Sequence, residues 1–162
     1  MSDRPIPRSY WVKPGSFLAG EYPGHEQEEW TQTRFERFRA AGVTAFLDLT
    51  EEGELPPYDD RLACWATHRR FPIRDFSCPS EEEMRLTLDG IDAALAGETV
   101  YLHCWGGTGR TGTVVGCWLV RHGMDGEEAL ARIAALRRET AYGDRRSPES
   151  DEQWAMVRGW RR

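Results

Sequence analysis

Residues 103–112 of the chain read HCWGGTGRTG, and this stretch decides the fold. The apolar run that precedes it, 99–103, predicts a short buried strand, and the nearly all-apolar run that follows, 110–121, predicts a helix. Three glycines fall within the five residues after Cys104, which lets the backbone curl so that successive N–H groups point inward. Open α/β folds bind ligands where a strand ends at the carboxyl edge of the sheet, and this loop favours an anion there.

Cys104 and Arg110 stand six positions apart, at the two ends of the glycine-rich loop. The helix that begins near Arg110 directs the positive end of its dipole at the loop, and the guanidinium fork fits two phosphoryl oxygens. The same field favours the thiolate form of a cysteine, which is its nucleophilic form. The loop therefore combines a nucleophile, Cys104, with a cradle for an oxyanion.

Outside the loop, the chain alternates between strand-like and helix-like patterns. Ser80 with Glu83 and Asp125 with Glu128 have the spacing of capping boxes and predict two helix starts. The alternation predicts an α/β architecture around a mostly parallel sheet. Strands are expected within 10–23, at 43–49 and at Arg70 to Ile73, helices at 27–41, 80–96, 125–139 and 149–160, and a loop at 51–62.

Length and composition limit the class of protein. The 162 residues, 40% hydrophobic and 30% charged, suit one globular domain, expected to span 1–162 with a core at about 10–160. The net charge of −6 disfavours nucleic acid and anionic membranes as partners. No apolar stretch approaches the ~20 residues of a bilayer span, and the first residues lack a secretory signal. The four cysteines form no C-x-x-C pair, so we expect free thiols, a cytoplasmic location and no bound metal.

Three other interpretations of the loop compete with an active site. Gly107, Gly109 and Gly112 formally match a dinucleotide-binding fingerprint, but that motif expects a second strand with an acidic residue about 20 positions on, and here another helix follows. A nucleotide-binding P-loop needs a lysine, which the stretch lacks. A purely structural interpretation makes Cys104 a core thiol and the glycines a tight turn.

The stretch His-Cys-x5-Arg-Thr resembles the signature of the cysteine-dependent protein tyrosine and dual-specificity phosphatases. The aromatic-Gly-Gly form after the cysteine is most similar to the kinase-associated phosphatase branch, and the resemblance extends from about Leu18 to Val157. It implies a central four- or five-stranded sheet flanked by helices on both faces. It also implies hydrolysis of phosphate monoesters through a phosphocysteine, without a metal or other cofactor. The implied partners are a phosphorylated protein or a small phosphomonoester, with phosphate or vanadate as site ligands.

Such chemistry needs an acid that protonates the leaving oxygen. Residues 71–79 read FPIRDFSCP and resemble the Pro-x-x-Asp-x-x-x-Pro acid loop of the family, which makes Asp75 the candidate. Asp75 precedes Cys104 by 29 positions, in keeping with the family's spacing. The competing interpretation is a turn-forming surface aspartate, and Asp48, at the end of its own predicted strand, is the second candidate acid.

The resemblance implies roles for further residues. His103 would orient the loop, which is compatible with a satisfied core histidine, and Thr111 would offer its hydroxyl to the sulfur, unless it bonds the helix backbone. Gln153 would help to place the hydrolytic water, unless it is an exposed helix residue. Cys78 and Cys64 are candidates for a regulatory disulfide with Cys104, although buried thiols are the favoured interpretation. The expected substrate-binding residues are Trp105 at the pocket entrance, Gly106, Gly107, Thr108, Gly109 and Gln153.

We therefore expect a phosphatase that acts on phosphotyrosine, with phosphoserine and phosphothreonine left open. One alternative is a pseudophosphatase that binds phosphoproteins, against which the presence of both Cys104 and Asp75 argues. Another is a lipid or inositol phosphatase of the same superfamily, which the absence of lysine from the loop disfavours. A non-enzymatic nucleotide-binding module is the third.

Overall fold

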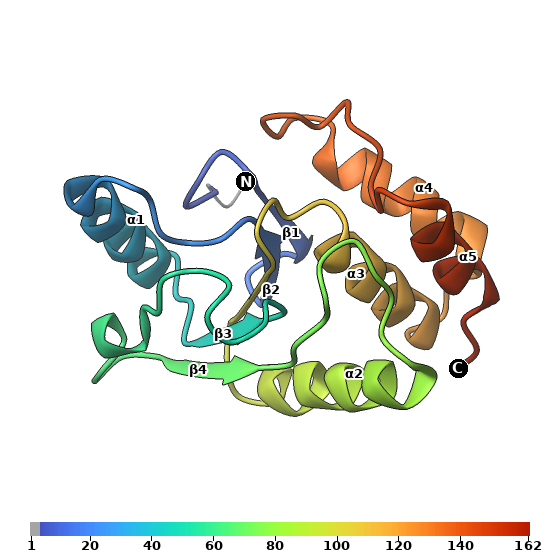
Figure 1. Cartoon of the computed structure of the whole chain (residues 1–162), viewed down its shortest axis with the longest axis horizontal. Coiled ribbons are helices and arrows are strands. Elements are labelled where there is room, and N and C mark those ends of the chain that lie inside the picture. The colour runs from blue at the N-terminus through green and yellow to red at the C-terminus, as the bar shows by residue number, and fades with distance from the viewer. Residues whose placement is uncertain (1–3) are drawn as a thin grey trace.

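The computed structural model describes residues 4–162 and has a five-stranded sheet at its centre (Figure 1). One edge pair is antiparallel and the three other pairs are parallel, so the expected mostly parallel α/β sheet is confirmed. The strands, in their spatial order, are β1 (Ser9–Lys13), β2 (Phe17–Gly20), β5 (Val100–His103), β3 (Ala45–Asp48) and β4 (Thr67–Arg70).

Helices cover both faces of the sheet, as expected. Figure 1 shows α1 on one side and α2 to α5 gathered on the other. The side chains of β5 alternate between two buried clusters: Tyr101 packs with Phe38 of α1, whereas Val100 and Leu102 belong to the larger cluster on the opposite face. The helices are α1 (Glu28–Ala40), α2 (Glu81–Leu95), α3 (Arg110–Arg121), α4 (Gly126–Arg137) and α5 (Asp151–Gly159), and η1 (Asp59–Arg61) is a short 3-10 turn.

Helix α3 runs through the larger cluster, and every residue from 110 to 120 is buried. Because α2, α4 and α5 all pack against α3, it has no solvent-facing stripe. This burial explains why the sequence of α3 is nearly all apolar. Of the helices in the part of the chain that the structure describes, none is long and apolar enough to span a membrane.

The helix starts follow local capping chemistry. Both expected capping boxes are present, at Ser80 with Glu83 and at Asp125 with Glu128. A third box, which the sequence analysis did not single out, begins α5: the Ser150 hydroxyl accepts from the Gln153 N–H, and the Gln153 side chain accepts from the Ser150 N–H. Since α5 starts at the edge of the glycine-rich loop, this cap also affects the site.

The expected strand at Arg70 to Ile73 is wrong by three residues, because β4 occupies Thr67–Arg70. This edge strand is selected by its backbone pairing with β3, and its side chains are exposed or half-buried. The apolar residues that suggested a strand instead lead the chain away from the sheet, where Ile73 turns into the core. The strands expected within 10–23 are β1 and β2, which pair as an antiparallel hairpin.

The register of the sheet brings four strand ends into one row. Gly20 pairs with His103, His103 with Asp48, and Asp48 with Arg70, so β2, β5, β3 and β4 end together. The segments that leave this row include the glycine-rich loop. The row therefore defines the rim at which the candidate site is built.

Candidate active site

The glycine-rich loop wraps around the sulfur of Cys104, which is only 3% exposed. The Gly107 N–H donates to Cys104 Sγ at 3.3 Å. Gly107 has φ +75°, and a Cβ on it would lie 2.5 Å from the backbone of Gly20 in the neighbouring strand. Only glycine fits this position, so the path of the loop around the sulfur depends on it.

Helix α3 begins at the end of the loop and points its positive end toward Cys104. The Thr111 hydroxyl is buried and has no hydrogen-bond partner among residues 4–162, so it does not bond the helix backbone. The neighbouring Thr113 does make that bond, to Gly109 O at 2.8 Å. The Thr111 hydroxyl is therefore uncommitted, and its expected role toward the sulfur stays a prediction.

Arg110 is 2% exposed and holds a carboxylate that the sequence analysis missed. Its Nη1 and Nη2 donate to Glu54 Oε1 and Oε2 at 2.9 and 2.7 Å, and Nη1 also donates to Ile73 O at 2.9 Å. The hydrogen bond from Arg110 lowers the pKa of Glu54 below its ordinary value. The run of acids at 51–54, just after the end of β3, was the signal available in the sequence.

Asp75 lies beside the same guanidinium. Its Oδ1 is 3.2 Å from Arg110 Nη2 and also accepts from the Phe76 N–H at 2.9 Å. Asp75 and Cys104 line one small cavity of about 20 Å³, together with Arg110 and Gln153. The structure thus brings three of the expected catalytic residues, Cys104, Arg110 and Asp75, to one place. The carboxylate of Asp75 forms an ion pair with the guanidinium of Arg110.

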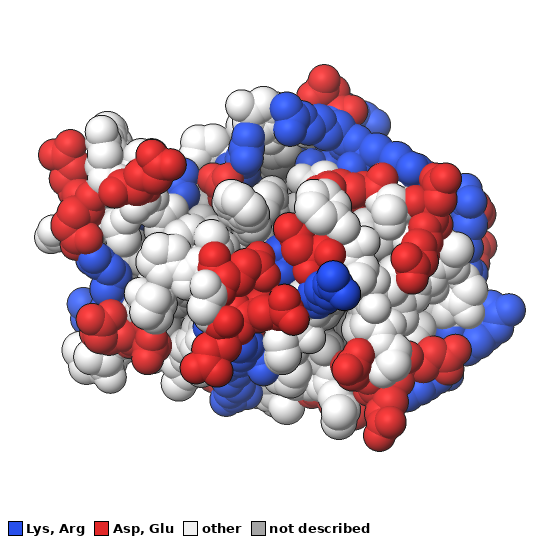
Figure 2. All heavy atoms as spheres, in the orientation of Figure 1, with Lys and Arg blue, Asp and Glu red and all other residues white. Residues whose placement is uncertain are grey.

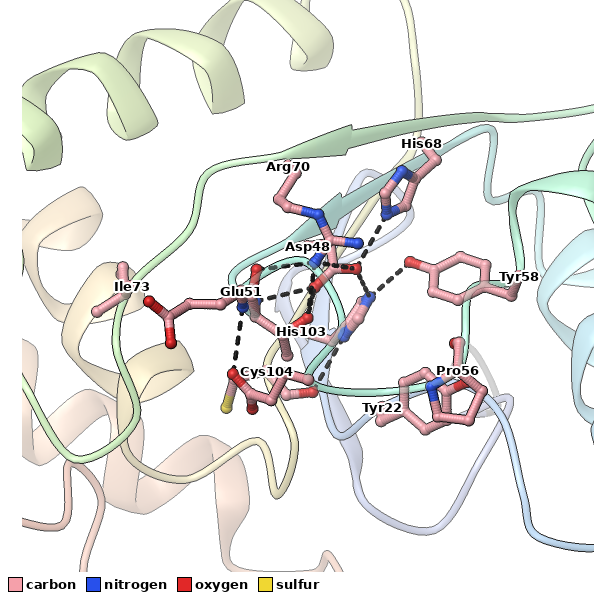
Figure 3. A network of polar contacts seen from close by, with 12 residues as sticks. Tyr22, Asp48, Glu51, Pro56, Tyr58, His68, Arg70, Ile73, His103 and Cys104 are labelled. Atoms are coloured by element: carbon pink, nitrogen blue, oxygen red, sulfur yellow. Dashed lines mark hydrogen bonds and ion pairs between the residues drawn. The ribbon is translucent and has the colours of Figure 1, made fainter.

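Asp48, the second candidate acid, lies in a separate buried network (Figure 3). Its carboxylate accepts from the N–H and hydroxyl of Thr50 at 2.9 and 2.6 Å and contacts His68 Nε2 at 2.9 Å. Burial opposes ionisation, but the hydrogen bonds from His68 and Thr50 and the proximity of His103 hold the pKa of Asp48 well below its ordinary value. Asp48 does not line the cavity of Cys104, and a carboxyl held ionised is a poor proton donor.

His103 connects that network to the loop (Figure 3). The ring is fully buried, with Nδ1 3.0 Å from Cys104 O and Nε2 2.6 Å from the Tyr58 hydroxyl. Burial lowers the pKa of His103 and raises that of Tyr58, so both groups are neutral at pH 7. With Tyr58 donating to Nε2, Nδ1 carries the proton and donates to the carbonyl of Cys104. His103 is thus a satisfied core histidine that also holds the start of the loop.

Gln153 is 1% exposed, so the interpretation as an exposed helix residue is wrong. Its Oε1 accepts from the N–H groups of Glu149 and Ser150, at 3.0 and 3.1 Å. Its Nε2 donates to Ser77 O at 3.5 Å, in the acid loop. Gln153 therefore ties the start of α5 to the segment that carries Asp75, while its role in placing water stays a prediction.

The other loop residues line different spaces. Trp105 is 59% exposed and lines an open groove of about 400 Å³ with Tyr22, Leu55 and Pro56. The Thr108 carbonyl accepts from the Ser147 hydroxyl at 2.6 Å. Gly106 and Gly109 line the cavity of Cys104 itself.

The remaining thiols lie outside this cavity. Cys64 is exposed and Cys78 half-buried, and all four cysteines are free. Burial, with a smaller contribution from Glu152, raises the pKa of Cys78 to about 11. Within residues 4–162, no group of three or more His, Cys, Asp or Glu side chains is arranged to hold a metal ion.

Comparison with known proteins gives a consistent result. A family model described as "Swiss Army Knife protein, DSP-PTPase phosphatase domain" matches residues 7–158. A putative tyrosine phosphatase of Invertebrate iridescent virus 3 is 38% identical over 112 residues, which cover 63% of this chain and 41% of that protein. The phosphatidylglycerophosphate phosphatase PTPMT2 of Arabidopsis thaliana is 37% identical over 105 residues, covering 62% of this chain and 46% of that protein.

Among solved structures, Tk-PTP in its active form superposes with a TM-score of 0.72 at 28% identity, covering 93% of this chain and 94% of that one. The matched region is less than half of each of the two curated relatives. The likeness therefore concerns the phosphatase domain.

Proposed function

Since the chain belongs to the family of DSP-PTPase phosphatase domains, we propose that it hydrolyses phosphate monoesters through a phosphocysteine on Cys104. The observation that carries the proposal is the meeting of Cys104, Arg110 and Asp75 around one cavity, with the Gly107 N–H donating to the Cys104 sulfur. A nucleophile, an oxyanion cradle and an acid are the three parts that the reaction requires.

In the first step, Cys104 Sγ attacks phosphorus. The S–P bond forms as the P–O bond to the leaving group breaks, and Asp75 gives its proton to the leaving oxygen. In the second step, water attacks the phosphocysteine and gives a proton to Asp75. The S–P bond then breaks, which regenerates the thiolate and releases inorganic phosphate.

The resting contact of Asp75 with Arg110 has a consequence for binding. The cavity of about 20 Å³ has room for little more than one water molecule. A phosphate that reaches Arg110 must therefore displace the Asp75 carboxylate from Nη2. Once displaced and protonated, Asp75 is free to approach the leaving oxygen.

Phosphotyrosine is the substrate that we propose. The groove beside Trp105 is open, apolar in part and lined by the aromatic ring of Tyr22, which suits a peptide that carries an aryl phosphate. The viral relative named a putative tyrosine phosphatase agrees with this choice. The plant relative named a phosphatidylglycerophosphate phosphatase supports a lipid phosphate as the second candidate.

The test is turnover by the wild type and by Cys104→Ser. We expect the wild type to release phosphate from para-nitrophenyl phosphate and from a phosphotyrosine peptide, also in EDTA, and Cys104→Ser to be inactive while still binding vanadate. Higher kcat/KM for phosphatidylglycerophosphate than for the peptide would favour the second candidate. Wild-type activity in Cys104→Ser would overturn the mechanism.

A further inference from the structure

Tyr22 lies just after β2 and bonds two parts of the site at once. Its N–H donates to Trp105 O at 2.9 Å, in the loop that follows Cys104. Its hydroxyl donates to Pro56 O at 2.6 Å, two residues beyond Glu54, and Figure 3 shows Tyr22 beside Pro56. The proposed reaction uses the ring of Tyr22 as a wall of the groove and assigns no task to this hydroxyl.

The backbone that carries Tyr22 is fixed by α1 and β5. Arg34 of α1 donates to Gly24 O at 2.9 Å and to Tyr22 O at 3.4 Å, and it pairs with Glu21 at 3.1 Å. The Tyr101 hydroxyl of β5 donates to Glu21 O. Because these bonds come from the sheet and from a packed helix, Tyr22 stands on a rigid base.

The ring of Tyr22 also has a defined place. It makes edge contacts with Tyr58 and His103, at centroid distances of 6.0 and 6.1 Å. A Cβ on Gly24 would lie 2.7 Å from the Tyr22 ring, so glycine at this position leaves room for it. Burial raises the pKa of Tyr22, so the hydroxyl is protonated at neutral pH and donates. Packing therefore holds this donor at the carbonyl of Pro56.

The segment that presents Glu54 is electrostatically unfavourable by itself. Glu51, Glu52 and Glu54 all lie within four residues and are exposed or half-buried. Figure 2 shows acidic side chains gathered near the centre of this face, where Figure 1 has the segment after β3. The Glu54 N–H donates to Glu51 O at 3.1 Å, which closes a turn within the segment but does not attach it to the sheet. Since like charges repel, the segment needs bonds from outside to keep its shape.

Such bonds are found on both sides of Glu54. Before it, Arg70 Nη1 of β4 donates to Thr50 O at 2.8 Å. After it, the Tyr22 hydroxyl donates to Pro56 O. The second bond is closer along the chain to Glu54, and it comes from a residue that also bonds the glycine-rich loop. Tyr22 can thus set the spacing between the two segments that Glu54 and Arg110 bridge.

We propose that Tyr22 is a positioning residue for Arg110. Its hydroxyl holds the segment 54–56 so that both oxygens of Glu54 stay on the guanidinium, and the guanidinium stays in the plane that receives an oxyanion. Tyr22 itself contacts neither the sulfur nor the phosphate in this arrangement. The consequence for turnover rests on the proposed function, whereas the orientation of the guanidinium does not.

Tyr22→Phe tests the proposal, because it removes the hydroxyl and keeps the ring. Inorganic vanadate is the probe, since it carries no peptide that could occupy the groove. We expect the Kd of vanadate to rise about fivefold and kcat/KM for para-nitrophenyl phosphate to fall by a similar factor, the scale of one hydrogen bond. Equal vanadate affinity in Tyr22→Phe and the wild type would overturn the proposal.

Tyr142→Phe is the matched control. Its ring is 48% exposed and packs against Arg8 and Arg145 instead of the segment after β3. The same loss of a hydroxyl should therefore leave the Kd of vanadate as in the wild type. A fivefold rise in Tyr142→Phe as well would show that the effect does not depend on Pro56, which would also overturn the proposal.

A double-mutant cycle tests the route through Glu54. In the Glu54→Gln background the bidentate pair is already lost, so we expect Tyr22→Phe to add no further rise in the Kd of vanadate. Losses that multiply would mean that the hydroxyl acts by another route. A general loss of packing would also multiply, so the cycle separates positioning from a merely structural role.

NMR of the Arg110 side chain gives an independent signature. Because the pair with Glu54 restrains rotation of the guanidinium, we expect separate Nη–H resonances for Arg110 in the wild type. These should merge in Tyr22→Phe as they do in Glu54→Gln, and stay separate in Tyr142→Phe. Unchanged Arg110 resonances in Tyr22→Phe would contradict the proposal.

The measurements keep the two proposals apart. If the wild type releases no phosphate from any ester but the vanadate and NMR responses are as expected, the proposed function is rejected and the positioning role stands. If the wild type turns over phosphotyrosine peptide and Tyr22→Phe does so equally well with equal vanadate affinity, the positioning role is rejected and the phosphatase stands.

Discussion

One guanidinium, that of Arg110, is shared by two carboxylates with different tasks. Glu54 contacts both terminal nitrogens, whereas Asp75 contacts one of them and is 40% exposed. The bidentate pair with Glu54 fixes the plane of the guanidinium, and the single contact with Asp75 is easier to break. In the proposed reaction, Glu54 would therefore position the guanidinium, and Asp75 would be the group that moves to the substrate.

Replacing Asp75 should slow the reaction of substrates with a poor leaving group more than that of substrates with a good one. A tyrosine phenol has a pKa of about 10 and leaves poorly without a proton. Asp75→Asn keeps the size of the side chain but removes the acid, so we expect kcat/KM for a phosphotyrosine peptide to fall by about 10²–10⁴. For the phosphate ester of a very acidic phenol, the rate of phosphocysteine formation in a single turnover should fall much less.

Asp48→Asn is the matched control for the choice of acid. It removes a carboxyl that lies outside the cavity of Cys104, so the dependence on the leaving group should stay as in the wild type. If Asp48→Asn instead abolishes the reaction with phosphotyrosine and Asp75→Asn does not, the acid has been misassigned.

Glu54→Gln should lower affinity for the transition state while the fold persists. The amide keeps one acceptor but loses the charge-assisted pair, which frees the guanidinium to rotate. We expect a loss of about tenfold in both kcat/KM and vanadate affinity, the scale of one such bond. Glu54→Asp, which keeps the charge, should recover part of it. Tighter vanadate binding in Glu54→Gln would mean that Glu54 competes with the substrate for Arg110.

At this scale the sequence reveals the residues of the loop but not their partners. Cys104 and Arg110 sit in one local motif, so their proximity follows from the loop alone. Glu54 and Tyr58 come from the segment after β3, and their contacts depend on how that segment folds over the sheet. No periodicity or spacing encodes such contacts. For the same reason, the sequence left open whether Gln153 lies at the site or on the surface, and the structure buries it.

The glycine-rich loop is the element most sensitive to backbone geometry. In Gly107→Ala the new Cβ would meet the backbone of Gly20 at a φ of +75°, so both position and conformation are unfavourable. We expect a loss of more than about 1 kcal/mol in stability, together with loss of vanadate binding. Thermal unfolding and vanadate inhibition measure the two effects.

Gly106→Ala provides the control within the same loop. No atom lies within 4 Å of a Cβ built there, and its φ is not in the left-handed region. The free energy of unfolding of the variant should lie within about 0.5 kcal/mol of that of the wild type, as is usual for surface substitutions. If both substitutions lower the stability equally, the sensitivity belongs to the whole loop and not to Gly107 in particular.

Helices were more predictable than strands, for a physical reason. The capping boxes at Ser80 and Asp125 are local signals, and they fixed the starts of α2 and α4. The edge strand β4 is defined by hydrogen bonds to β3 and has little apolar pattern of its own. Its position therefore follows from tertiary pairing, which the sequence does not display locally.

The whole molecule should lose stability in acid through its buried polar network. Asp48 has a pKa below its ordinary value of about 3.9, so it binds a proton more readily in the unfolded chain. The stability that it contributes is present above about pH 4 and is lost as the pH falls toward the lower folded-state pKa. His103 acts in the same direction below about pH 6.5, because burial disfavours its charged form.

Unfolding by urea at a series of pH values checks this expectation. The wild type should lose stability in two stages, below about pH 6.5 and again below about pH 4. Asp48→Asn should be less stable at pH 7 and lack the second stage. Asp89→Asn, whose side chain is 67% exposed on α2, is the control and should keep the wild-type profile. A second stage that persists in Asp48→Asn would assign it to other carboxyls, such as Glu54.

The strands end in a common row at Gly20, His103, Asp48 and Arg70, and most of the segment after β3 is exposed or half-buried. Residues 51–57 leave from this row and are all exposed or half-buried, so neither buried cluster depends on them. We therefore expect grafts of other sequences and lengths at 55–57 to reshape the groove beside Trp105 and to leave the packing of the interior unchanged. This surface segment is therefore a suitable place to introduce variation in the directed evolution of new specificities.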